Sequence, residues 1–231
     1  MRSMRLVAAS LILWSGLCLA VAAREPWSRA VVVDERLAAL RQSPAFDAPL
    51  VRRLSRGRRV TVMATRRGPE GIEYCRVAVT RRTRGWLQRE SLIFPNKIHE
   101  DERLLRLINE SEGFDRIARS RLFLQYYPQS KLRPVALAAS AEAAELAALE
   151  LTRAARRRFT KEKLSGQTAP EYTYYLNFSG LDRYNRQGIN FIFNRQSSSF
   201  YYNGAHWREI LRRYPRSAEA QRALRASSRG E

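Results

Sequence analysis

The strongest strand signal lies in the run Tyr74-Cys75-Arg76-Val77-Ala78-Val79. Small apolar side chains alternate with others along it, which is the period-two pattern of a half-buried strand. Short β-branched runs also occur at 30–33 and 60–62, and turn signals such as Gly68-Pro69 separate the runs. Several short strands at this spacing predict a small closed barrel over residues 28–95.

Three segments follow one another within this region. The first is Leu40-Arg41-Gln42-Ser43-Pro44. The second, 54–62, has the pattern Leu-x-x-Gly-x-x-Val-x-Val, and the third is Gly85-Trp86-Leu87. Their order resembles the bacterial SH3-like domain over residues 28–95. The opening departs from the family, which often has Asn-Val-Arg followed by Gly-Pro. A ligand contact that depends on those opening positions is therefore not carried over.

The resemblance implies a groove that takes an extended peptide. Tyr74 and Trp86 are the candidate aromatic lining, and Arg82 and Arg84 are the candidate charged residues beside it. The ring of Trp86 could instead fill the interior of the barrel. A cell-wall peptide of peptidoglycan or a segment of a partner protein is the expected ligand.

The chain is strongly basic. It has 231 residues, with 42 Lys and Arg against 22 Asp and Glu, and a net charge of +20. Residues 28–95 hold fifteen of these basic residues against six acidic ones. Such a surface attracts polyanions, namely an acidic envelope polymer, lipid headgroups or nucleic acid. Only four of the basic residues are lysine, which also fits a general arginine bias in composition.

Residues 1–23 have the order of a signal peptide. Two arginines precede an apolar run, and small residues end it at Ala20-Val21-Ala22-Ala23. The alternative is an uncleaved membrane anchor. Ser15-Gly16-Leu17 before Cys18 does not match a lipoprotein signal. We therefore expect export to the periplasm or cell envelope, which disfavours nucleic acid as the partner. Cys75 is the remaining thiol and is expected to be a buried core residue.

The pattern changes to helical after Pro95. Leu104, Leu107 and Ile108 have the spacing of a helix face, and residues 97–160 are predicted to form a helical module. An alanine-rich stretch runs from Val135 to about Phe159 and has high helix propensity. The run Arg156-Arg157-Arg158 near its expected end would complement the helix dipole.

An internal repeat relates residues 121–137 to 208–224. Both copies contain Tyr-Pro-x-Ser, at Tyr127, Pro128 and Ser130 and again at Tyr214, Pro215 and Ser217. Proline ends one helix and serine can cap the next, so each copy predicts a helical hairpin. The element resembles the tetratricopeptide-type repeats of bacterial periplasmic proteins, with 205–229 as the second hairpin.

Residues 161–204 interrupt the repeat with an irregular insertion. Alternating aromatic residues on both sides of Arg195-Gln196-Ser197-Ser198-Ser199 predict a β-hairpin over 189–202. A lone hairpin is unstable in water, so its Phe side chains should dock on neighbouring helices. The many Tyr and Phe residues of 172–202 could also stack on sugars, but their spacing favours core packing.

No motif for catalysis, a metal or a cofactor is present, and none of the three is expected. His99 and His206 lie in different segments, and neither has metal-ligand spacing. The sequence therefore predicts an α+β protein, in which a small SH3-like β-barrel precedes tetratricopeptide-like helical hairpins interrupted by a β-hairpin. Its predicted role is non-catalytic binding or scaffolding in the envelope. The alternatives are an envelope hydrolase using Glu171, Asp182 and His206, and a purely structural subunit.

Overall fold

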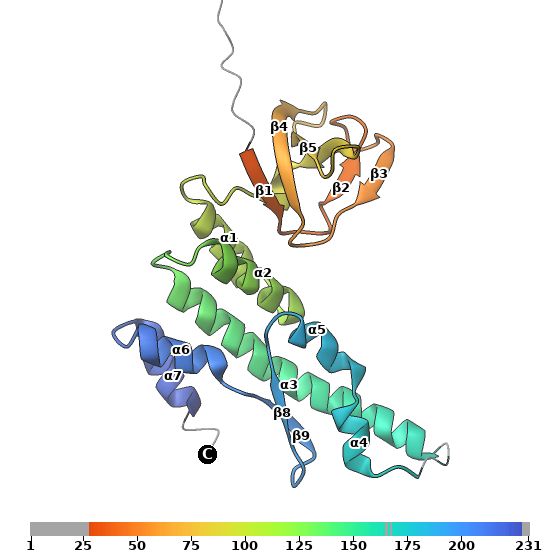
Figure 1. Ribbon diagram of the computed structural model, residues 1–231, viewed down its shortest axis with the longest axis vertical. Coiled ribbons are helices and arrows are strands. Elements are labelled where there is room, and N and C mark those ends of the chain that lie inside the picture. Colours follow the sequence, from red (N-terminus) through yellow and green to blue (C-terminus); the bar gives the residue numbers. More distant parts are fainter. Residues whose placement is uncertain (1–27, 165, 167, 228–231) are drawn as a thin grey trace, which may run out of the picture.

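The computed structural model describes residues 28–164, 166 and 168–227. The predicted signal peptide and Cys18 lie outside the described residues. The fold is mixed α+β, with an antiparallel sheet at one end and a group of helices that extends away from it (Figure 1). Within the described part of the chain, no helix combines the length and apolar character that crossing a membrane requires.

The sheet has seven strands in the order β3-β2-β6-β5-β4-β1-β7. Their bounds are β1 (Ser28–Val32), β2 (Ala39–Arg41), β3 (Leu50–Arg53), β4 (Arg59–Arg67), β5 (Glu73–Ala78), β6 (Arg84–Gln88) and β7 (Leu92–Ile93). The expectation of a closed barrel is wrong, because β3 and β7 are edges that do not pair with each other. At the β7 edge the buried side chain of Ile93 belongs to the same core as Leu104 and Ile108.

One face of the sheet is lined by buried hydrophobic side chains that form a core. Cys75 and Val77 of β5 point into it beside Leu40 and Leu87. Burial raises the pKa of the Cys75 thiol to about 11. Cys75 is thus a packed core residue, as the strand pattern predicts.

The helical part is built on one long helix, α3, which runs diagonally through Figure 1. The helices are α1 (Glu100–Asn109), α2 (Gly113–Tyr126), α3 (Arg133–Leu164), α4 (Glu171–Leu176), α5 (Asp182–Asn185), α6 (Ala205–Arg213) and α7 (Ala218–Ser227), with short 3₁₀ turns η1 (Arg89–Ser91) and η2 (Ser179–Leu181). Since α3 continues to Leu164, Arg156–Arg158 do not complement its C-terminus as predicted. Lys161 and Lys163 occupy the last turn instead.

The two repeat copies form equivalent turns. The Tyr127 N–H donates to the Phe123 carbonyl at 2.9 Å, and the Tyr214 N–H donates to the Ile210 carbonyl at 2.8 Å. In both copies the serine N–H then donates back to the tyrosine carbonyl. The side chains differ. Ser130 Oγ accepts from the Leu132 N–H at 3.2 Å, whereas the buried Ser217 Oγ has no partner among the described residues. The predicted serine cap is therefore wrong for the second copy.

Strands β8 (Phe191–Asn194) and β9 (Ser199–Tyr202) form the antiparallel hairpin that the alternating aromatics predict. The ring of Phe193 stacks on Tyr175 of α4 with 4.7 Å between centroids. Thr152 Oγ1 of α3 accepts a hydrogen bond of 2.8 Å from the Phe200 N–H. The hairpin is thus docked on helices, and Tyr175, Tyr184 and Phe200 are core residues.

Sheet and helices share a second core. Val31, Val33 and Ile93 from the sheet side are buried against α1, α2 and the first part of α3. Beside this core, Arg119 of α2 reaches back to the sheet and pairs with Asp34 at 2.9 Å. The helices after Pro95 therefore pack against the part of the sheet formed by β1 and β7.

Candidate binding surface

The sheet register places Trp86 between two arginines. Arg41 of β2 and Arg76 of β5 are both directly opposite Trp86 of β6. Directly opposed residues point to the same side of a sheet. The core side is occupied by Leu87 and its neighbours, so Trp86 lies on the other side. The alternative in which Trp86 fills the interior is therefore wrong.

The same side continues along the neighbouring rows. Arg84 is opposite Ala78, and Arg66 of β4 is opposite Tyr74. We use the name outer face for a set of one tryptophan, one phenylalanine and four arginines: Arg41, Phe46, Arg66, Arg76, Arg84 and Trp86. Among the described residues, none accepts an ion pair or hydrogen bond from the side chains of Arg66, Arg76 or Arg84. These three guanidinium groups are therefore unpaired within the described part of the chain.

Tyr74 also points to this side but is not a surface residue. Its ring is buried beneath the turn at Gly68, where an added Cβ would lie 2.9 Å from Tyr74 Cε2 and 2.5 Å from the Pro44 carbonyl oxygen. Burial raises the pKa of its hydroxyl. Tyr74 therefore packs beneath the outer face. The prediction that it contacts a ligand is wrong, because its side chain is buried.

Sequence reasoning missed Phe46, which is 61% exposed. Its loop is held from two sides, because the Phe46 N–H donates to Glu70 Oε1 at 2.7 Å and Arg41 Nη1 donates to the Ala48 carbonyl at 2.7 Å. The Arg41 guanidinium lies 5.5 Å from the Phe46 ring centroid. The nearest sequence signal was the Ser43-Pro44 turn, which indicates a loop but does not say that an aromatic ring is presented there.

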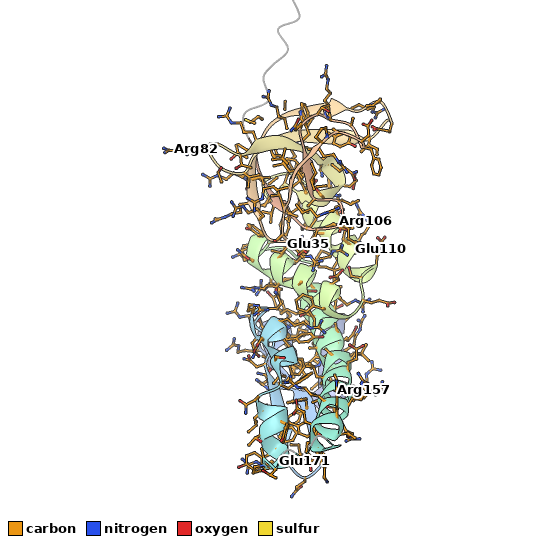
Figure 2. The ribbon with its side chains drawn as sticks, turned by 90° about the vertical axis from the view of Figure 1, so that its right-hand side faces the viewer. Glu35, Arg82, Arg106, Glu110, Arg157 and Glu171 are labelled. Atoms are coloured by element: carbon orange, nitrogen blue, oxygen red, sulfur yellow. The ribbon has the colours of Figure 1, made fainter. Side chains whose placement is uncertain are left out.

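Arg82 lies away from this group. It is exposed in the turn between β5 and β6, and Figure 2 shows it at the end of the molecule that holds the sheet, pointing outward. Its own N–H donates to Thr80 Oγ1 at 3.3 Å. Of the four predicted ligand residues, the structure thus brings Trp86 and Arg84 onto one surface, buries Tyr74 and leaves Arg82 at the rim.

Glu171 and His206 of the hydrolase alternative are not brought together. Glu171 begins α4, near the end of α3 that is distant from the sheet, whereas α6 with His206 packs near the beginning of α3 (Figures 1 and 2). Burial lowers the pKa of His206, and Glu209 raises it by a smaller amount. The described residues contain no group of three or more His, Cys, Asp or Glu that could hold a metal ion.

What the arrangement offers chemically is an aromatic ring framed by guanidinium groups on a rigid antiparallel sheet. Such a surface can pair with carboxylates or phosphates and pack on apolar side chains at the same time. No protein family, no curated protein and no solved structure matches the chain.

Proposed function

We propose that this chain is a non-catalytic binding protein of the cell envelope, exported by its N-terminal segment, and that its outer face holds a cell-wall peptide. In this proposal the sheet is an SH3-like domain. The helices are tetratricopeptide-type hairpins that form a scaffold and offer a further surface to a partner protein. The segment order of residues 28–95 and the repeated Tyr-Pro-x-Ser turn support the two assignments.

The observation that carries the proposal is the row Arg41–Trp86–Arg76. Peptides of peptidoglycan carry free carboxylates next to short apolar side chains. A guanidinium group pairs with a carboxylate through charge-assisted hydrogen bonds, and an indole ring packs on the apolar part. Tryptophan and arginine are also the side chains that most often dominate binding surfaces.

Retention on purified peptidoglycan tests the proposal. The purified protein should co-sediment with insoluble peptidoglycan, and Trp86→Ala should weaken this binding by about tenfold or more, because a central aromatic anchor typically contributes at least about 2 kcal/mol. Arg76→Gln should also weaken it. Added salt should reduce binding of the unaltered protein, since exposed charges are screened.

Arg106→Gln is the matched control. Arg106 is an exposed arginine on α1, outside the sheet (Figure 2). It should bind peptidoglycan like the unaltered protein. Absence of binding by the unaltered protein, or an equal loss in Arg76→Gln and Arg106→Gln, would contradict the proposal. Binding of an envelope protein that depends on Trp86, without binding of peptidoglycan, would point to the partner-protein alternative.

One observation favours the structural-subunit alternative. Leu146 and Leu149 lie three residues apart on α3, and both are more than half exposed. In a subunit of a larger assembly this face would be covered. Exchange of both residues for serine should then shift the protein from a larger to a smaller species in size-exclusion chromatography of envelope extracts. In the binding proposal the same exchange leaves peptidoglycan retention unchanged.

A further inference from the structure

A second basic surface lies on the helical part, far from the outer face. Arg153 and Arg157 are one helical turn apart on α3, and Arg183 of α5 faces them across a hollow of about 380 Å³. Arg153 and Arg157 also line an adjoining hollow of about 430 Å³, together with Arg156. Figure 2 shows Arg157 on the half of α3 that is distant from the sheet. We call the two spaces together the arginine hollow.

The α3 arginines of the hollow lack partners. No described residue accepts an ion pair or hydrogen bond from the side chains of Arg153, Arg156 or Arg157. Arg158, the next residue along, instead pairs with Glu162 at 2.7 Å. Like charges three and four residues apart on a helix repel one another. A bound anion would remove this repulsion.

Arg183 is oriented by aromatic rings rather than by a carboxylate. Its guanidinium carbon lies 4.7 Å from the Tyr184 ring centroid and 5.2 Å from that of Phe114. Nη2 donates to the Tyr184 hydroxyl at 2.8 Å. Stacking leaves the other donors of the planar guanidinium available, so Arg183 can still bind an anion.

The floor of the hollow is apolar. Leu151 and Phe178 line it, and the Phe178 ring lies so close to Gly180 that an added Cβ would stand 2.4 Å from Phe178 Cε1. The carboxylate in the lining is that of the exposed Glu150. The hollow thus combines several guanidinium groups and one carboxylate with an apolar floor formed by Leu151 and Phe178.

We propose that the arginine hollow binds a ligand with two or more phosphate groups, with Arg153 and Arg157 on one phosphate and Arg183 on another. Arginine forks match the oxygens of phosphate, and several forks around one space suit a multiply charged anion better than a single carboxylate. The apolar floor would receive the organic part of the molecule. This inference is independent of the proposed peptidoglycan binding.

Calorimetric titration with pyrophosphate is the first test. Pyrophosphate should bind the unaltered protein, and Arg157→Gln should weaken binding about tenfold. Arg158→Gln is the matched control, because it removes the same charge from the next position, where the guanidinium is paired outside the hollow. It should change the affinity by less than about twofold. Glu150→Gln should strengthen binding, since it removes the carboxylate from the lining.

Several results would overturn the inference. These are absence of pyrophosphate binding, an equal loss in Arg157→Gln and Arg158→Gln, and citrate binding as tightly as pyrophosphate. Circular dichroism of each variant checks that it is folded. Trp86→Ala should bind pyrophosphate normally, which separates this site from the outer face.

A vesicle experiment then identifies the source of the phosphate. Phosphatidylcholine vesicles with and without cardiolipin, whose headgroup carries two phosphates, are mixed with the unaltered protein and with Arg157→Gln. Sedimentation that needs both cardiolipin and Arg157 assigns the hollow to a lipid headgroup. Pyrophosphate binding without such sedimentation assigns it to a free phosphorylated molecule, and loss of both kinds of binding contradicts the proposal.

Discussion

At the scale of single residues, the buried pair Asp34–Arg119 is one of the polar links between sheet and helices. Asp34 is 5% exposed and Arg119 is 3% exposed. Arg119 Nη2 donates to Asp34 Oδ2 at 2.9 Å, and Arg36 donates to the same carboxylate through Nη2 at 2.7 Å. Arg119 also donates to Ser111 Oγ. The carboxylate thus binds two guanidinium groups, one of them from another layer of the molecule.

The pKa values of the pair show the competing effects of burial and charge. Burial alone would raise the pKa of Asp34, but the hydrogen bonds from Arg36 and the charge of Arg119 outweigh it and hold the pKa below its usual value. Burial lowers the pKa of Arg119, although Asp34 opposes that change. Such pairs position their elements more than they add net stability, because desolvation offsets the attraction.

Removal of the carboxylate should be strongly destabilising. Asp34→Asn leaves the guanidinium of Arg119 buried without its paired carboxylate, and we expect the free energy of unfolding to fall by about 3 kcal/mol. Urea unfolding measures this. Asp47→Asn, at an exposed aspartate in the loop between β2 and β3, should stay within about 0.5 kcal/mol of the unaltered protein. Equal effects in the two variants would contradict the assigned role.

The same pair predicts a pH dependence. Because the pKa of Asp34 is lower in the folded than in the unfolded chain, its ionised form stabilises the fold above the unfolded value of about 4. This contribution is lost as pH falls through the folded pKa. The difference in unfolding free energy between the unaltered protein and Asp34→Asn should therefore be constant from about pH 7 to 5 and shrink below about pH 4. A difference that grows in acid would have the wrong sign.

At the scale of elements, α3 is the helix on which the rest of the helical part is built. Its small residues Ala141, Ala144 and Ala148 are buried, so neighbouring helices and the hairpin can approach closely. Thr152 makes a specific link, since Oγ1 donates to the Ala148 carbonyl and accepts from the Phe200 N–H, both at 2.8 Å. One side chain thereby connects α3 to β9.

Thr152→Val tests this link. The substitution keeps the shape but leaves the buried Phe200 N–H without an acceptor, which should lower the free energy of unfolding by about 1–3 kcal/mol. Thr160→Val is the control, because Thr160 makes the same kind of bond to its own helix at an exposed position and none to the hairpin. Thermal unfolding of both variants gives the comparison. A loss in Thr160→Val as large as that in Thr152→Val would rule out the hairpin bond as the cause.

At the scale of the whole molecule, the shared core makes sheet and helices depend on each other. Val31, Val33 and Ile93 are buried together with Phe123 of α2 and Leu104 of α1. Apolar surface of both parts would be exposed to water if either unfolded alone. The two parts should therefore unfold in one cooperative transition.

Ile93→Ala probes this dependence. It removes a fully buried side chain at the junction, so the free energy of unfolding should fall by about 2–5 kcal/mol. With Trp14, Trp27 and Trp207 replaced by phenylalanine, Trp86 fluorescence reports on the sheet and far-ultraviolet circular dichroism on the helices, and both midpoints should fall together. Ile192→Ala, at a side chain 45% exposed on the hairpin, should have a small effect. Separate transitions for the two signals would contradict a single cooperative unit.

Local signals were predictable where neighbouring residues decide the structure. The repeated Tyr-Pro-x-Ser turn follows from the missing N–H of proline, and the hairpin follows from alternating aromatics around a polar connection. The end of α3 was not predictable in this way, because Lys and Arg continue a helix as readily as they end one. The prediction that Arg156–Arg158 complement its C-terminus was wrong for this reason.

The candidate surfaces depended on contacts between distant segments. Because side chains alternate along a strand, Trp86 and Leu87 must point to different sides of the sheet. Only the pairing of β2, β6 and β5, however, places Trp86 between Arg41 and Arg76. In the same way, Arg157 and Arg183 face one hollow only because α5 folds back along α3.

The amino-acid sequence alone determined the Tyr-Pro-x-Ser turns, the hairpin within 189–202 and the strongly basic character of the chain, because these properties depend on residue type and short spacing. It did not predict the short helices α4 and α5, which lie in the stretch expected to be irregular. The tertiary structure alone decided that the sheet stays open, that Tyr74 is covered and that the arginines gather at two places. Those outcomes depend on which side chains fill the space between elements, and the free energy of packing is set by all the contacting segments together.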